Sequence, residues 1–193
     1  EMVWLFAARR SEFWLCVAAI TGVVLLGVLN GILVAVALSL VNFVRRLWRP
    51  YDAVLGRIEK RRGYHDVDRN PDAREVPGLV LFRFDAPLFF ANANRYRERL
   101  ELLVEENPGE EEWLVLDFEG VGEADTTAVD MLVELLDEHR EAGRVVAIAR
   151  ANEPVLRRLE RAELLQPEGP TIVFPTINAA VRAFRNRPTE DPS

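Results

Sequence analysis

The sequence predicts an α/β domain with a mixed, largely parallel sheet flanked by helices, preceded by an all-α membrane segment. From Phe13 to Val44 almost no residue is charged, which is typical of helices embedded in lipid. Beyond Pro77, short apolar runs alternate with amphipathic ones, the pattern of strands connected by helices. The net charge is −7 and most acidic residues lie beyond Tyr51, so a nucleic-acid-binding function is not expected.

The N-terminal apolar segment consists of residues 13–29 and 32–44, separated by Asn30-Gly31. A continuous helix over 13–44 would be roughly 48 Å long, well beyond a hydrocarbon core of about 30 Å. A break at Asn30-Gly31 would give two shorter helices instead. Basic residues flank the segment at both ends: Arg9, Arg10, Arg45, Arg46 and Arg49. This distribution favours a hairpin with both ends on the cytoplasmic side, and a single tilted anchor helix is the alternative.

Residues 49–77 are rich in Pro, Arg and Asp and show little periodicity. They predict a linker with one short strand near Tyr64–Val67. The basic cluster RIEKRR (57–62) follows the apolar segment closely and could contact anionic lipid headgroups. A linker whose charges are simply solvated is the alternative interpretation.

The remaining chain predicts alternating strands and helices. We expect strands at 78–85, 86–92, 112–118, 144–150 and 171–175, and helices at 94–107, 127–143, 153–164 and 177–187. The helix over 127–143 has apolar residues at helical spacing and ends at Gly143, and Pro154 suits the first turn of the next helix. Two consecutive strands at the start of this region indicate a mixed sheet.

Residues that support catalysis or metal binding are sparse. Cys16 is the only cysteine, and it lies inside the apolar segment. His65 and His139 are far apart, and no cysteine, histidine and carboxylate cluster has metal-ligand spacing. The glycines of 120–122 do not form a dinucleotide fingerprint, and no phosphate-loop lysine is present. We therefore expect no enzyme activity, no metal and no cofactor.

Three strings together resemble the C-terminal end of SulP-family anion transporters, whose last transmembrane helices lead into a cytoplasmic STAS domain. They are RPYDAVLGRI (49–58), FRFDAPLFFANANRYRERL (82–100) and LDFEGVGEADTTAVDMLVELL (116–136). The resemblance covers nearly the whole chain. It implies transmembrane segments of the transporter at 1–48, the linker at 49–77, a STAS domain at 78–187 and a disordered tail at 188–193.

The same resemblance implies a function. The chain would be a fragment of a sulfate-type secondary transporter that lacks the anion site. Its STAS domain would be a regulatory and assembly module in the cytoplasmic membrane, facing the cytoplasm. The expected partners are the rest of the membrane domain, a second copy in a homodimer, the lipid membrane and a cytoplasmic regulatory protein.

The start of the helix at 127–143 is the candidate site. Asp125, Thr126 and Thr127 can all accept hydrogen bonds from free N–H groups of the first turn, and Thr127 and Asp130 have a spacing like a capping box. Anti-sigma-factor antagonists, which resemble STAS domains, carry an aspartate and a phosphorylated serine here. Asp125 and Thr126 occupy those positions, although threonine replaces serine and Ala128 replaces a glycine. The alternative function is therefore a membrane-tethered signalling module switched by phosphorylation at Thr126, with the turn as a docking point for partners.

The run Leu88, Phe89 and Phe90 comes just before a helix start at Asn92 or Asn94, both good capping residues. The two phenylalanines are expected either in the core or, where one is exposed, in contact with the membrane domain or another subunit.

Overall fold

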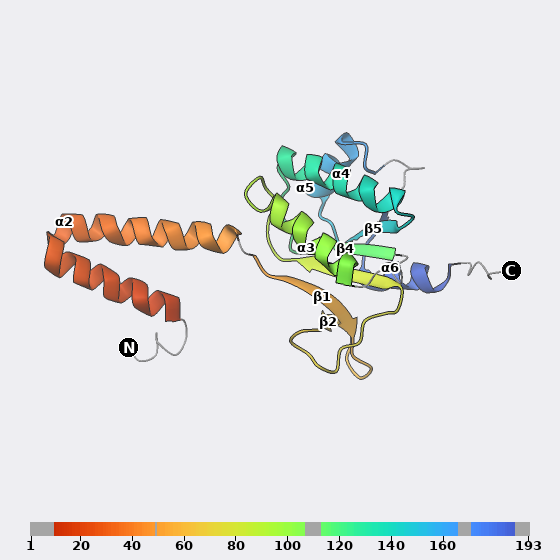
Figure 1. Ribbon diagram of the computed structural model, residues 1–193, viewed down its shortest axis with the longest axis horizontal. Coiled ribbons are helices and arrows are strands. Elements are labelled where there is room, and N and C mark those ends of the chain that lie inside the picture. Colours follow the sequence, from red (N-terminus) through yellow and green to blue (C-terminus); the bar gives the residue numbers. More distant parts are fainter. Residues whose placement is uncertain (1–9, 49, 107–112, 166–170, 188–193) are drawn as a thin grey trace. The chain divides into compact units, whose positions relative to one another are not determined.

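The computed structural model describes residues 10–48, 50–106, 113–165 and 171–187 (Figure 1). The chain separates into two compact units, Glu1–Trp48 and Arg49–Ser193. The predicted tail at 188–193 lies outside the described residues, and the bounds of the four predicted segments stay predictions.

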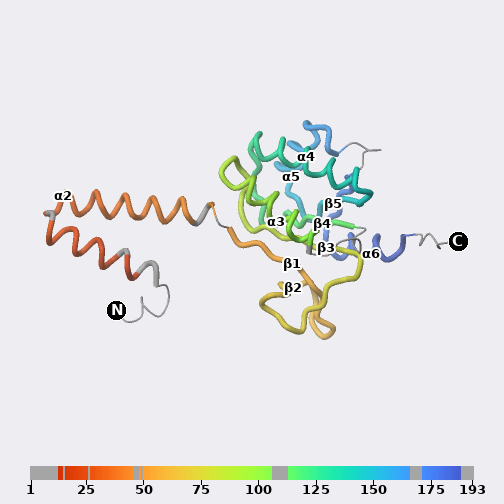
Figure 2. The backbone as a smooth tube through the Cα atoms, in the orientation of Figure 1, coloured from red at the N-terminus to blue at the C-terminus, as the bar shows by residue number. Residues whose placement is uncertain are grey.

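The first unit is one helical segment, α2 (Arg10–Trp48), with two legs joined at Gly27 (Figures 1 and 2). Gly27 has φ 81° and ψ 166°, a conformation that a residue with a Cβ rarely adopts. Helix α2 is therefore a helical hairpin, as predicted. The prediction that the break lies at Asn30-Gly31 is wrong, because it lies at Gly27. Asn30 and Gly31 lie inside the helix of the second leg.

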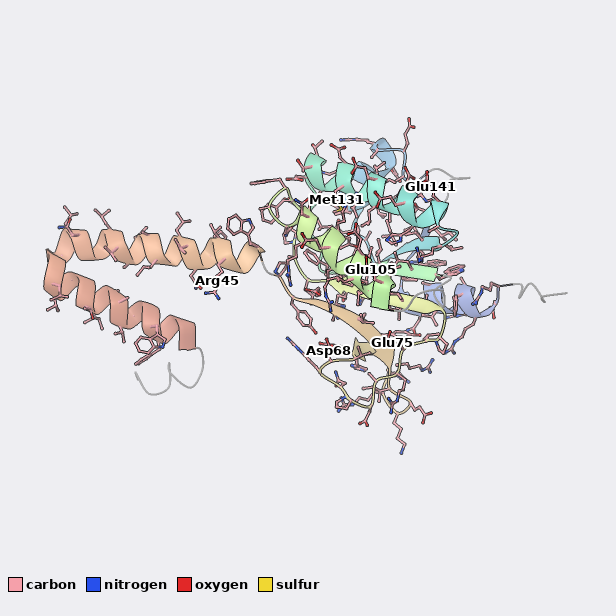
Figure 3. The ribbon with its side chains drawn as sticks, in the orientation of Figure 1. Arg45, Asp68, Glu75, Glu105, Met131 and Glu141 are labelled. Carbon is pink, nitrogen blue, oxygen red and sulfur yellow. The ribbon has the colours of Figure 1, made fainter. Side chains whose placement is uncertain are left out.

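Gly31 has a different role, because it is where the two legs approach each other closely. A Cβ at Gly31 would lie 2.4 Å from the backbone nitrogen of Val23 and 2.6 Å from its Cγ2 atom. The apolar side chains instead project away from the legs, and Leu25 and Leu29 are both 74% exposed (Figure 3). By length and composition, Gly27–Arg45 is long and apolar enough to cross a bilayer.

The second unit is built on a sheet. Its strands are β1 (Asp52–Arg57), β2 (Tyr64–Asp66), β3 (Leu79–Phe84), β4 (Trp113–Asp117), β5 (Val145–Ala149) and β6 (Thr171–Phe174). In the described part of the chain the strand order is β2-β1-β3-β4-β5-β6. Strands β3 to β6 run parallel, and β1 is antiparallel to both of its neighbours, which confirms the mixed, largely parallel sheet.

Strand β1 lies within residues 49–77, where the sequence predicts a linker with one short strand. Val54 pairs with Phe82 of β3, and Ala53 and Leu55 are each only 2% exposed. The six-residue strand is therefore part of the core, although its flanks are polar. Strand β2 coincides with the predicted strand near Tyr64–Val67.

The prediction of a second strand at 86–92 is wrong. These residues form turns, and Leu88 makes a single parallel bridge to Ala124. Pro87 has no N–H to donate to a ladder, and the amide side chain of Asn92 bonds back to Pro87 O at 2.8 Å. The antiparallel partner of β3 is β1 instead.

Helices cover both faces of the sheet. They are α3 (Ala93–Glu106), α4 (Thr126–Glu141), α5 (Glu153–Arg161) and α6 (Ile177–Arg185). Leu100 of α3, Leu132 of α4 and Leu159 of α5 share one buried cluster with the sheet. Phe184 of α6 belongs to a second cluster, with Trp113 and other side chains of the opposite strand face. Three connecting helices therefore lie on one face and α6 lies on the other (Figure 1).

Candidate docking and phosphorylation site

Two loops meet at the carboxyl ends of β3 and β4. The backbone N–H of Leu88 donates to Glu123 O at 2.9 Å, and the N–H of Asp125 donates to Leu88 O at 3.0 Å. Leu88 is 1% exposed and Ala124 is fully buried, so the joint has an apolar base. This two-bond bridge fixes the loop after β3 against the start of α4.

The carboxylate of Asp125 holds this arrangement from both sides. Its Oδ1 accepts from Ala128 N at 2.8 Å, which caps α4, and its Oδ2 accepts from Phe90 N at 2.9 Å. Of the three predicted capping residues, Asp125 is therefore the one that caps. The predicted capping box between Thr127 and Asp130 is wrong, because the helix already begins at Thr126.

The bond from Phe90 N to Asp125 helps to hold an exposed aromatic turn. Phe90 is 70% exposed, and its ring meets the half-buried ring of Phe89 edge-to-face at a centroid distance of 5.7 Å. Asn92, which is fully buried, accepts from Phe89 N at 2.9 Å through its Oδ1. The sequence left open whether the two phenylalanines lie in the core or are exposed. Phe90 is exposed, so its ring is not part of the core. The turn that carries it is held by side-chain to backbone bonds on both sides.

Thr126 and Thr127 are both exposed at the first turn of α4. Thr126 lines a hollow of about 500 Å³ between α4 and α5, together with Val129, Asp130, Arg158, Arg161 and Ala162. The guanidinium of Arg158 also bonds Ala124 O, so one of the two arginines is fixed beside the helix start. A phosphate on Thr126 would meet a helix N-terminus and two cations, and it would be opposed by Asp125 and Asp130.

A charged network that the sequence did not reveal lies at the ends of β3, β4 and β5. Asp117, 1% exposed, accepts from Arg83 Nε at 2.7 Å and from Arg150 Nε at 2.9 Å. Glu119 pairs with Arg150 at 2.6 Å. Arg150 has φ 61°, an unusual value for a residue with a side chain, and its backbone N–H donates to Phe174 O at 3.0 Å. Asp85 lies in the same region, and burial raises the pKa of its carboxyl group.

The only sequence signal for this network was Asp117 at the end of an apolar strand. Its partners come from strands 34 residues upstream and 33 residues downstream, so local pattern could not identify them. Removing Asp117 would leave two arginines without their shared partner, so the network is best explained as stabilising the ends of the strands.

The described residues contain no group of three or more His, Cys, Asp or Glu side chains placed to hold a metal ion. His139 is buried on α4, and burial together with the nearby Arg144 lowers its pKa. The geometry around Asp125 is suited to holding and presenting a surface.

The second unit therefore combines a mixed sheet, with helices on both faces, and a fixed turn at the start of α4. The family model for the STAS domain matches residues 70–180, which is more than half of the chain. The chain therefore belongs to the STAS domain family.

Curated relatives place this domain in a membrane context. The chain is 45% identical, over 93% of its length, to a probable sulfate transporter of Mycobacterium tuberculosis, of which it covers 32%. It is 30% identical over 93% of its length to sulfate transporter 3.1 of Arabidopsis thaliana, of which it covers 29%. The chain thus spans about a third of the length of the curated relatives it matches.

A solved structure shares the fold. The murine solute carrier 26 family member A9 anion transporter, in an inward-facing state, matches 96% of this chain with a TM-score of 0.81. The match covers 30% of that transporter at 19% sequence identity, so it establishes similarity of fold. The comparison includes the helical hairpin as well as the sheet, since it covers almost all of the chain.

Proposed function

We propose that the chain is the C-terminal part of a SulP-type secondary transporter for sulfate, and that its STAS domain is a non-enzymatic regulatory and assembly module. The main support for this proposal is the order of the elements. The helical hairpin α2, with its exposed apolar side chains, is followed almost directly in sequence by a STAS domain. Helix α2 ends at Trp48 and strand β1 begins at Asp52. Two relatives are described as sulfate transporters, and this chain covers only 32% and 29% of their lengths, which also supports the proposal.

The chain itself has no complete transport pathway in this proposal. The anion site belongs to the part of the relatives that this chain does not cover, where transporters of this kind bind substrate near the bilayer midplane. The two legs of α2 complete the membrane domain, and the sheet lies in the cytoplasm as part of a homodimer. Exposed apolar surface on α2 is then covered by lipid and neighbouring helices.

Uptake of labelled sulfate into proteoliposomes tests the transport function. The complete polypeptide that contains this chain is expected to show saturable uptake. A version that ends after Trp48 is expected to insert but to transport less, because it lacks the module. If the complete polypeptide moves neither sulfate nor another divalent anion, the proposal fails.

The aromatic turn is the proposed contact between the STAS domain and its partners in the transporter. An exposed ring on a fixed turn loses little conformational entropy on binding, which is a property of interface anchors. Phe90→Ser is expected to weaken assembly by about 1–2 kcal/mol. The matched control is Leu102→Ser, which removes a 48%-exposed apolar side chain from α3. Equal uptake and equal cross-linked dimer in both variants and in the wild type would contradict this role.

A second candidate function is a phosphorylation-controlled signalling module. The observation that favours it is the exposed Thr126 beside Arg158 and Arg161 in one hollow. A phosphothreonine there would gain charge-assisted hydrogen bonds from the arginines.

Mass spectrometry of the protein isolated from its own cells tests this alternative. Phosphate is expected on Thr126 and is expected to persist in Thr127→Ala. Partner binding should differ between Thr126→Ala and Thr126→Glu. Unchanged binding by both variants would exclude the switch.

A further inference from the structure

The turn between β1 and β2 gathers cations on a protein of net charge −7. Arg57, Lys60, Arg61 and Arg62 are all exposed, and within the described residues none of them forms an ion pair. By contrast, most arginines of α3 and the strand ends are paired with carboxylates. The positive charges of the turn are therefore not neutralised by carboxylates of the described residues.

The base of the turn, at the end of β1, is fixed to a neighbouring segment. Arg57 N donates to Arg74 O at 2.7 Å, and Arg74 N donates back to Arg57 O at 2.9 Å. Gly56 makes this approach possible, because a Cβ there would lie 2.8 Å from the carbonyl group of Arg74. The segment around Asp68 and Glu75 therefore stays beside strands β1 and β2 (Figure 3).

The cations surround one hollow of about 320 Å³. Its lining consists of Arg57, Glu59, Lys60, Arg61, Arg62, Gly63, Tyr64 and Asn178. Glu59 is the only acidic residue in that lining, so four positive charges face one negative charge. Tyr64 and Asn178 add neutral groups that can donate hydrogen bonds.

A second hollow, of about 650 Å³, shares Glu59, Lys60 and Arg61 with the first. Its lining has two acidic residues, Glu59 and Asp72, against four cations, because Arg69 and Arg74 join Lys60 and Arg61. Of these cations, Arg69 is already engaged. The Arg69 guanidinium lies 4.1 Å from the ring centre of Tyr51 and pairs with Asp66. The smaller hollow is therefore the more favourable site for an anion.

We propose that the smaller hollow binds a phosphate group. Its volume falls at the lower end of the range for small-ligand sites, about 300–1,000 Å³. Unpaired guanidinium groups bind phosphate through paired, charge-assisted hydrogen bonds, and a dianion would relieve the repulsion among the four cations. The phosphate can come from a free phosphate ion or from an anionic lipid headgroup, and the same groups would bind both. The site does not depend on the transport function.

Hydrogen–deuterium exchange of the segment 56–67, measured on the full chain in nanodiscs, tests this site. One arm adds inorganic phosphate to phosphatidylcholine nanodiscs, with potassium chloride at equal ionic strength as the salt control. The other arm adds no phosphate and compares these nanodiscs with nanodiscs containing about 30% phosphatidylglycerol. A bound ligand slows exchange by a factor that approaches 1 + [L]/Kd, because it stabilises the closed state.

The test variant is Arg61→Gln combined with Arg62→Gln. The matched control is Arg182→Gln combined with Arg185→Gln, which removes the same charge from exposed positions on α6. Saturable slowing by phosphate that the test variant loses and the control retains supports the site with a free ion as ligand. If exchange slows only in the phosphatidylglycerol nanodiscs, and again only the test variant loses the slowing, the site is supported with a lipid headgroup as its ligand. No slowing in either arm, or equal slowing in all three proteins, would overturn the proposal.

Discussion

The two units of this chain place their apolar side chains in opposite environments. In α2 the large side chains point outward, as Leu25 and Leu29 do, and a glycine lies where the legs meet. In the STAS domain Leu100 and Leu132 are fully buried and charged residues cover the surface. The two units therefore suit different environments, since the exposed apolar surface of α2 is typical of helices that lipid or other membrane helices cover.

The largest effect is expected in the core of the STAS domain. Phe82 is 1% exposed and its ring lies 5.3 Å from that of Tyr96. Phe82→Ala should lower the free energy of unfolding by about 3–5 kcal/mol, because it removes packed atoms and leaves a cavity. Urea unfolding of the full chain in detergent, followed by near-UV circular dichroism, measures it.

Phe43→Ala is the matched change in α2, where the side chain is 59% exposed. It should leave unfolding of the STAS domain unchanged. Equal losses from both substitutions would remove the distinction between the two units.

The next effect concerns the contact between the legs of α2. Gly31→Leu would place a side chain against the backbone of Val23, which costs about 1–3 kcal/mol and should separate the legs. Spin labels at Cys16 and at an introduced Leu38→Cys report the distance between the legs. The separation should increase in Gly31→Leu and stay unchanged in the control Leu33→Ala, which alters a 61%-exposed side chain. An unchanged distance in both would show that Gly31 does not set the contact.

A smaller effect is expected at the start of α4. Asp125→Ala removes the acceptor for Ala128 N and Phe90 N, and should lower the free energy of unfolding by about 1–2 kcal/mol. Amide exchange of Phe90 and Ala128 should accelerate together. Asp130→Ala, at an exposed position of the same helix, should stay within about 0.5 kcal/mol of the wild type. Faster exchange at Ala128 alone would contradict the role of Asp125 as a hydrogen-bond acceptor for both Ala128 N and Phe90 N.

The smallest effect is a pH dependence from His139. Burial, aided by Arg144, lowers the pKa of its imidazole from 6.5, so the unfolded chain takes up the proton at higher pH than the folded chain does. Its contribution to stability is therefore present above about pH 6.5 and is lost as pH falls toward the lowered pKa. His139→Gln should flatten the decline in unfolding free energy between about pH 7.5 and about pH 5.5. Parallel declines in both proteins would contradict this assignment.

The periodic elements of the STAS domain could be predicted from sequence, because each carries its own pattern. Strands β3 to β6 and the helices α3 to α6 all lie where apolar spacing and capping residues place them. Strand β1 could not be predicted, since its burial depends on pairing with Phe82, 28 residues after Val54. The run at 86–92 is apolar enough for a strand, but Pro87 and Asn92 make it a turn.

The candidate site shows the same limit. Local sequence predicted that Asp125 could cap the helix, because an N-cap involves residues three apart. It could not predict the bond from Phe90, which is 35 residues away. The sequence predicts the break in α2 at the wrong place for a related reason, because Gly27 and Gly31 cannot be told apart by local pattern. Only their φ angles and neighbours distinguish a turn from a close contact.

The proposed function requires that this helical hairpin and STAS domain form one end of a larger membrane polypeptide. An immunoblot of native membranes with an antibody against the STAS domain tests it most directly. The chain has a mass of 21.9 kDa and covers 32% of its Mycobacterium tuberculosis relative, so we expect a membrane-bound band about three times as heavy. A band at 21.9 kDa with no heavier form would contradict it.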